Sequence, residues 1–280
     1  MNMFASGDSE RFQSGAKKYA AYLVTPEGRL RSDLTFANLR DFLALRAGES
    51  LRARESLLAL DIGCGTGATA VRLARLGIHV TVLDCSAAML DITRLAVNEA
   101  RVADKVVLEH GDATELASLF PARSFDVILC HNILEYVDDP EAVLRNAARA
   151  MRGSSAILSV LVRNQAGEVY KAAIREGDLA AAENNLTAEW GQESLYGGRV
   201  RLFTSDSLQE MMNATSLERI AERGVRVIAD YLPPSVSRSA EYERILALER
   251  KLGMRPEFAA VARYTHCLVR RADPAMEDRV

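Results

Sequence analysis

The amino-acid sequence predicts an α/β fold with a mostly parallel sheet, and three observations support this. Between Leu57 and about Arg163, short apolar runs alternate with segments whose apolar residues recur at helical spacing, which is typical of βαβ units. The first apolar run breaks into a glycine-rich turn, and acidic residues stand at or just after the ends of three runs. Because the carboxyl ends of parallel strands meet at one edge of a sheet, these acids are expected to gather there.

The first strand and its turn occupy residues 58–67, Leu-Ala-Leu-Asp-Ile-Gly-Cys-Gly-Thr-Gly. The run contains Asp61 and then breaks into glycines at Gly63, Gly65 and Gly67, after which a helix-like segment begins. Alternating glycines allow a tight turn and let a ligand lie against bare backbone at the start of a helix. This stretch therefore predicts a nucleotide-binding strand–turn–helix unit.

Two further strands end near acidic side chains. The run over residues 80–83 is followed by Asp84, which can accept hydrogen bonds from both hydroxyls of a ribose. The run over residues 106–110 is followed by Asp112, whose carboxylate can accept from the exocyclic amine of an adenine. Together with the glycine turn, these residues predict a nucleoside cofactor.

The glycine turn alone does not identify the cofactor, because Gly63, Gly65 and Ala68 also satisfy the dinucleotide pattern G-x-G-x-x-G/A. A nicotinamide or flavin enzyme is therefore an alternative. Asp61 weighs against it, since a carboxylate beside the turn would repel a pyrophosphate but can hold the ammonium of an amino-acid moiety. The residues favour S-adenosylmethionine, in which a nucleoside is joined to an amino acid.

His131 follows the fourth apolar run, residues 124–130, at the edge where such folds bind ligands. It can touch the cofactor, act as a base or close the pocket, and a structural role is equally open. Glu135 and Tyr136 are expected at the same rim, although packing of one helical turn explains them equally well.

We divide the chain into five segments. These are an N-terminal helical segment over the cofactor (1–56), a cofactor-binding core (57–165), a cap or lid (166–202), a C-terminal segment that completes the sheet and faces the substrate (203–272), and a tail (273–280).

Within the N-terminal segment, a turn at residues 25–28 can bend the chain over the cofactor. Arg31 follows this turn, and its guanidinium can hold the carboxylate of the methionine moiety through two parallel hydrogen bonds. In the cap, a helical piece ending at Asn185 precedes a looser stretch that contains Trp190 and Tyr196. This looser stretch is expected to act as a lid.

The C-terminal segment is expected to contain one helix and two strands. The helix covers residues 204–213, with Thr204 or Ser205 as its N-cap. The strands lie around residues 220–228 and 264–269 and complete the sheet.

Composition limits the class of protein. The chain has 280 residues, 49% of them hydrophobic, and a formal net charge of −3, which suits one large domain or one domain with a cap. It contains no apolar run of membrane-spanning length, and residues 1–10 do not have the pattern of a signal peptide. The four cysteines form no C-x-x-C pair and the four histidines lack ligand spacing. We expect a cytoplasmic protein without a membrane or metal partner.

Charge argues mildly against a protein that wraps nucleic acid by electrostatics alone. Residues 219–271 nevertheless carry eleven arginines and lysines. They can form a basic face, although composition favours an ordinary solvated surface.

The order D-x-G-x-G-x-G, then D, then G-D-A resembles class I S-adenosylmethionine-dependent methyltransferases over residues 57–165. The resemblance implies a Rossmann-like, mostly parallel seven-stranded sheet with helices on both faces and a small cap, whose last strand is antiparallel. Methyl transfer from a sulfonium mainly requires positioning of the nucleophile and exclusion of water. No catalytic residue is therefore assigned beyond His131 as a candidate.

Segments outside this core resemble bacterial tRNA 5-carboxymethoxyuridine methyltransferases, which esterify the carboxylate of a modified wobble uridine in the anticodon loop. These segments are Gly28–Arg31, His131–Pro140, Gly224–Leu232, Tyr242–Glu249 and Arg263–His266.

Taken together, the residues and the resemblance imply two sets of site residues. The cofactor-binding set is Arg31, Asp61, Gly63, Cys64, Gly65, Gly67, Asp84, Met89, Asp112, Ala113 and His131. The substrate-side candidates implied by the resemblance are Arg226, Asp230, Tyr231 and His266. A strand edge with its packing partners explains the second set equally well.

The sequence departs from the tRNA enzymes in the cap, where a lysine-rich stretch is expected. Residues 182–190 contain no lysine, and Ile228-Ala229 replaces bulkier, more polar residues. Three hypotheses therefore stay open. The chain methylates a carboxylate in the tRNA anticodon stem-loop, methylates a small-molecule acceptor, or binds the cofactor without catalysis.

Overall fold

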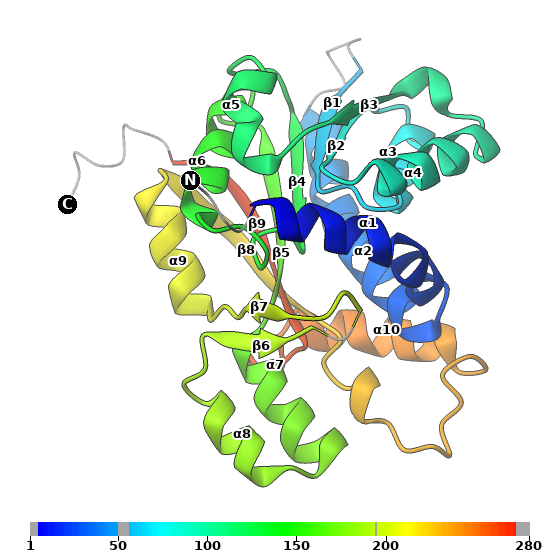
Figure 1. Ribbon diagram of the computed structural model, residues 1–280, viewed down its shortest axis with the longest axis vertical. Coiled ribbons are helices and arrows are strands. Elements are labelled where there is room, and N and C mark those ends of the chain that lie inside the picture. Colours follow the sequence, from blue (N-terminus) through cyan, green and yellow to red (C-terminus); the bar gives the residue numbers. More distant parts are fainter. Residues whose placement is uncertain (1–4, 50–55, 194, 273–280) are drawn as a thin grey trace.

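The computed structural model describes residues 5–49, 56–193 and 195–272, and the expected tail at 273–280 lies outside the described residues. The described chain forms one seven-stranded sheet with helices on both faces, and a second, two-stranded sheet (Figure 1).

The strands of the large sheet follow the order β3-β2-β1-β4-β5-β9-β8. They are β1 (Leu58–Ile62), β2 (His79–Asp84), β3 (Val106–His110), β4 (Val127–His131), β5 (Ile157–Arg163), β8 (Leu217–Val225) and β9 (Tyr264–Arg271). The small sheet pairs β6 (Trp190–Gln192) with β7 (Arg199–Arg201).

The helices precede, connect and follow the strands. They are α1 (Ala5–Leu23), α2 (Pro26–Glu49), α3 (Ala68–Arg75), α4 (Ala87–Glu99), α5 (Leu116–Leu119), α6 (Pro140–Ala150), α7 (Gln165–Tyr170), α8 (Leu179–Asn185), α9 (Ser205–Ala214), α10 (Tyr242–Gly253) and α11 (Pro256–Ala259). A π-helical turn, Lys171–Glu176, continues α7, and 3-10 turns occur at Ala103–Lys105, Ala113–Glu115 and Ala229–Tyr231.

The predicted fold class is confirmed by this topology. Strands β1 to β5 pair in parallel, and β9 lies between β5 and β8, antiparallel to both. The strand order reverses between β1 and β4, because β2 and β3 lie on one side of β1 and β4 and β5 lie on the other. In open α/β sheets such a reversal leaves a crevice at the carboxyl ends of the strands, where ligands bind.

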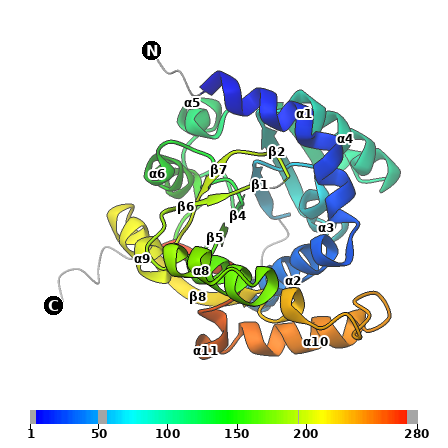
Figure 2. The same ribbon diagram turned by 60° about the horizontal axis from the view of Figure 1, so that its bottom comes forward.

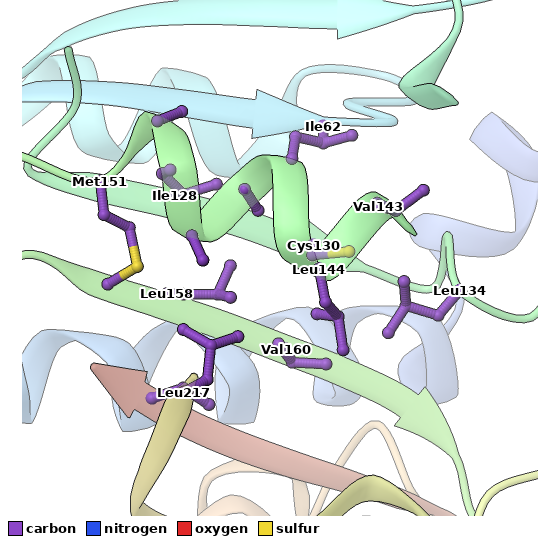
Figure 3. Close-up of a cluster of buried hydrophobic side chains, with 14 of the residues drawn as sticks. Ile62, Ile128, Cys130, Leu134, Val143, Leu144, Met151, Leu158, Val160 and Leu217 are labelled. Carbon is purple, nitrogen blue, oxygen red and sulfur yellow. The ribbon is translucent and has the colours of Figure 1, made fainter. Parts of the chain in front are cut away.

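Alternation along the strands builds two apolar layers. In β4, Ile128 and Cys130 face the layer made with α5, α6 and α9, whereas Val127 and Leu129 face the layer made with α2, α3 and α4. Figure 3 shows the first layer, where Leu144 of α6 packs against the sheet. Because successive strand residues point to opposite faces, a strand covered on both sides must be apolar throughout.

Strand β8 ends earlier than the sequence predicts, at Val225 instead of residue 228. Arg226 adopts a left-handed backbone with φ of 62°, which turns the chain out of the sheet. The freed backbone N–H groups of Val227, Ile228 and Ala229 donate to the carboxylate of Glu249 on α10, at 2.6, 2.9 and 2.7 Å. One buried side chain thus replaces the lost strand pairing.

The helix expected at residues 204–213 is present, and Thr204 caps it by accepting a hydrogen bond from the Ser207 backbone. The hairpin β6–β7 was not expected, because each strand has only three residues and the run includes Gly191. Figure 2 shows the hairpin crossing in front of the sheet, inside a ring of helices. In the part of the chain that the structure describes, no helix is long and apolar enough to cross a bilayer.

Replacing Glu249 should destabilise the fold. Glu249→Ala leaves three buried N–H groups without an acceptor, so we expect the free energy of unfolding to fall by about 3 kcal/mol in urea titrations. Glu249→Gln keeps a carbonyl oxygen, so its free energy of unfolding should fall by less. Glu243→Ala, at a side chain 82% exposed on the same helix, is the control and should change the free energy by less than about 0.5 kcal/mol. Equal effects of the two alanine variants would contradict this role for Glu249.

Candidate functional site

A cavity opens at the carboxyl ends of β1, β2 and β4, where the strand order reverses. Its wall includes Phe12 and Tyr19 of α1, Arg31 of α2, Asp84 of β2, His131 of β4 and Tyr196 of the loop between β6 and β7. A smaller pocket shares Tyr19, Arg31, Gly63, His131 and Asn132 with it and is also lined by Asp61 and Cys64. The predicted convergence of the strand ends therefore creates a cavity with two compartments.

The glycine turn after β1 depends on backbone conformations that only glycine adopts readily. Gly63, Gly65 and Gly67 have φ values of 66, 57 and 71°. A Cβ atom on Gly63 would lie 3.0 Å from the side chain of Ile133, and one on Gly67 would lie 2.5 Å from Thr93. Gly63 and Gly65 line the larger cavity, whereas Gly67 shapes the turn and lines neither compartment.

Asp84 ties this turn to the end of β2. The backbone N–H of Gly65 donates to its Oδ2 at 2.8 Å, and that of Ser86 donates to its Oδ1 at 2.9 Å. Burial raises the pKa of this carboxyl, and the two backbone hydrogen bonds oppose the rise. The carboxylate lines the larger cavity, where the sequence places a ribose.

Asp61 lies in the smaller pocket, four per cent exposed, near the end of β1. Burial, with the nearby charge of Asp84, raises the pKa of Asp61 to about 7. A cationic ligand group would stabilise its ionised form. This agrees with the expected role in holding an ammonium.

Arg31 projects from α2 between the two compartments and is almost completely buried. Its guanidinium donates to the Tyr19 hydroxyl at 2.8 Å and lies over the rings of Tyr22 and Tyr264, 5.0 and 5.6 Å from their centroids. Burial disfavours its charge, yet the surrounding tyrosine hydroxyls hold its pKa well above the ordinary value. Since no described carboxylate forms an ion pair with it, this cation is available to an anionic ligand.

The remaining cofactor candidates surround the same cavity. Met89, Asp112 and Ala113 line the larger compartment and Cys64 the smaller one. Asp112 Oδ1 accepts from the backbone N–H of Thr114 at 2.8 Å and so fixes the turn after β3. Burial raises the pKa of the Cys64 thiol well above its usual value, so this side chain stays neutral.

His131 belongs to a buried hydrogen-bond chain. Its Nε2 lies 2.8 Å from Ser159 Oγ, which lies 2.8 Å from Nε2 of His266. Nδ1 of His266 accepts from the side-chain amide of Asn38 at 3.3 Å. Burial, assisted by the charge of Arg31, lowers the pKa of His131 to about 3, so the imidazole is neutral at neutral pH and a weak base.

Glu135 and its neighbours form the wall opposite the glycine turn. Oε1 of Glu135 accepts from the Asn132 amide and from the Arg163 backbone N–H, both at 2.9 Å. Its Oε2 is buried and has no hydrogen-bond partner among the described residues. Arg163 donates to the carboxylate of Glu193 at 2.6 Å, which attaches the β6–β7 hairpin to this wall. Sequence reasoning missed Arg163 and Glu193, although the position of Arg163 at the carboxyl end of β5 was a usable signal.

The four substrate-side candidates lie behind the cavity wall and not in it. Arg226 and Asp230 form a buried ion pair, and Arg226 also donates to the Tyr22 hydroxyl at 2.9 Å. Tyr231 contacts the Gly167 carbonyl at 3.4 Å, and His266 is fully buried. None of the four lines either compartment. Their assignment to the substrate side stays a prediction.

Residues 60–158 match a sequence family described as a methyltransferase domain. The chain is 27% identical over 277 residues to the tRNA 5-carboxymethoxyuridine methyltransferase of Escherichia coli strain K12, covering 96% of this chain and 98% of that protein. It is 37% identical over 106 residues, 38% of this chain and 44% of the other, to the ubiquinone biosynthesis O-methyltransferase of Aromatoleum aromaticum.

A solved structure shares the fold. It is the 1,6-didemethyltoxoflavin-N1-methyltransferase of Burkholderia thailandensis with S-adenosylhomocysteine bound, at a TM-score of 0.58 and 14% identity, covering 98% of this chain and 92% of that one. The chain is an S-adenosylmethionine-dependent methyltransferase.

The residues of the methyltransferase site fit this cofactor. A buried guanidinium that pairs with no described carboxylate suits the carboxylate of a ligand, and Asp61 in the adjoining pocket suits an ammonium. When bound, S-adenosylmethionine supplies a methyl group on a positively charged sulfur that is already a good leaving group. The chain's own side chains then have to orient the acceptor and exclude water.

Arg31 should be required for cofactor binding by the methyltransferase. Arg31→Ala removes the cation between the two compartments, so calorimetry with S-adenosylhomocysteine should show at least about a tenfold weaker affinity. Arg29→Ala, at a side chain 57% exposed two residues earlier, is the matched control and should bind normally. An unchanged dissociation constant for Arg31→Ala would mean that this arginine does not hold the cofactor.

Asp61 should make the cofactor affinity of the methyltransferase depend on pH. Because its pKa in the free protein is raised to about 7, the carboxyl gains its charge as the pH rises through that value. Affinity for S-adenosylhomocysteine should therefore increase between about pH 5.5 and 7.5, since an ionised carboxylate attracts the ammonium. Calorimetry on Asp61→Asn should show a flatter profile. The same slope in both proteins would exclude Asp61 as the titrating group.

Proposed function

We propose that this methyltransferase forms a methyl ester on the carboxylate of 5-carboxymethoxyuridine in the tRNA anticodon loop. The observation that carries the proposal is the end-to-end similarity to the Escherichia coli tRNA enzyme, which extends over 96% of this chain and 98% of that protein. The similarity thus includes the N-terminal helices, the cap and the C-terminal segment, whereas the family model matches residues 60–158 only.

The chemistry of the cavity supports an acceptor that is already ionised. His131, with a pKa of about 3, is a poor base for removing a proton from a hydroxyl or an amine. A carboxylate needs no base, because its reference pKa of about 4 leaves it ionised at neutral pH.

The arrangement of the chain supports separate regions of the cavity for the cofactor and for the acceptor. We assign the cofactor to the pocket between the glycine turn and helices α1 and α2. We assign the acceptor to the side bounded by Glu135, Arg163 and the β6–β7 hairpin. In this assignment the segment 166–202 covers the acceptor, because Glu193 attaches the hairpin to Arg163 at the cavity wall.

A small-molecule acceptor is the second candidate. The ubiquinone biosynthesis O-methyltransferase of Aromatoleum aromaticum is more similar per residue, at 37% identity. That similarity covers only 38% of the chain, so it concerns the cofactor-binding core and carries less information about the acceptor.

The deciding experiment uses methyl-labelled S-adenosylmethionine and bulk tRNA from cells that lack the ester but contain the free carboxylate. We expect label on tRNA that is released as methanol by mild base, because methyl esters hydrolyse whereas N-methyl and ribose O-methyl groups do not. Base-stable label would contradict the ester. No label on tRNA, with S-adenosylhomocysteine binding intact, would favour the small-molecule candidate.

A further inference from the structure

The β6–β7 hairpin has an inner and an outer face. Trp190 pairs with Arg201, and Gln192 pairs with Arg199, so these four side chains share one face. Val200, between the two arginines, points the other way and is fully buried. Trp190 is 37% exposed on the outer face.

Two guanidinium groups lie over the exposed indole. The Cζ atoms of Arg199 and Arg201 are each 4.7 Å from the centre of the Trp190 ring. Within the described residues, neither arginine forms an ion pair with a carboxylate, not even with the exposed neighbour Glu189. The Nε atom of Arg201 is buried and lacks a hydrogen-bond partner in the same part of the chain.

This lack of ion pairs contrasts with three buried arginines around the site. Arg163, Arg226 and Arg263 are buried and paired with Glu193, Asp230 and Glu168, respectively. An arginine that serves only the fold is usually compensated in this way. The uncompensated pair on the hairpin therefore suits an external anion.

The hairpin that carries this face also borders the acceptor side of the cavity. The backbone N–H of Arg201 donates to the Glu135 carbonyl at 3.1 Å, and Glu135 lines the cavity. From the same hairpin, Glu193 pairs with Arg163, and the loop residues Leu195 and Tyr196 line the cavity. The same hairpin therefore supplies part of the cavity wall and the outer face.

We propose that Trp190, Arg199 and Arg201 form a stacking platform for the nucleotides that flank the target uridine of an RNA loop. An aromatic face stacks with any base, and guanidinium groups bind phosphates. An acidic peptide would use the arginines but not the indole face. This inference rests on the proposed function, and it locates the surface that holds the RNA substrate. Its arginines supply cationic charge that the lysine-free stretch 182–190 does not.

The test measures binding of a fluorescein-labelled anticodon stem-loop by anisotropy. Trp190→Ala should weaken binding about tenfold, and Trp190→Phe should retain most of the affinity because it keeps an aromatic face. Arg199→Ala and Arg201→Ala should each weaken binding and reduce the slope of log affinity against log salt by about one. Affinity for S-adenosylhomocysteine and the melting temperature should not change, which separates the platform from a folding defect.

Arg244→Ala is the control for loss of one positive charge, because this side chain is 87% exposed on α10, and it should bind the stem-loop normally. Polyglutamate should compete poorly with the stem-loop. Normal stem-loop affinity in Trp190→Ala, or equal competition by polyglutamate, would overturn the platform. If the wild type esterifies tRNA and the variants keep their affinity for the stem-loop, the platform is wrong and the proposed function stands. If the variants lose affinity for the stem-loop but the wild type forms no base-labile label on tRNA, the proposed function is wrong and the platform stands.

Discussion

The structure of the site depends on one carboxylate that holds a left-handed turn. The glycine turn after β1 has three left-handed backbone conformations, which glycine adopts without steric cost. Asp84 holds the turn by accepting the N–H of Gly65 at one oxygen, while its other oxygen accepts the N–H of Ser86. Two adjacent strands are thereby joined at their carboxyl ends. The helix that follows each strand starts from a fixed position, and the crevice between them keeps its shape.

Charge organises the opposite side of the cavity. Arg163 at the end of β5 lies between Glu168 of α7 and Glu193 of the hairpin, and Arg263 also pairs with Glu168. Since a buried charge without a partner is costly, these ion pairs fix the cap to the sheet in one arrangement. Arg31 is the exception in the cavity wall, as its described neighbours are tyrosines. The contrast distinguishes cations that are compensated by carboxylates from a cation that has no described carboxylate partner.

Local patterns explain why much of this site could be predicted. The turn and Asp84 are encoded in short stretches whose geometry follows from residue type. Arg31 was suggested by its position after the turn at residues 25–28, and the resemblance beyond the core supported it. Arg226 was named only through the resemblance, and no local pattern shows that its side chain pairs with Asp230 behind the cavity wall. The hairpin was not predicted because its three-residue strands depend on the distant Glu193–Arg163 contact.

The buried chain behind His131 has a consequence for proton position. Asn38 accepts from Arg223 through its oxygen, at 3.2 Å, so its amide nitrogen must face Nδ1 of His266. His266 is then the Nε2–H tautomer and donates to Ser159, whose single hydroxyl proton is left to donate to Nε2 of His131. The cavity histidine must therefore carry its own proton on Nδ1. A residue of the second helix, separated from the cavity imidazole by one ring and one hydroxyl group, selects which nitrogen of that imidazole is a donor.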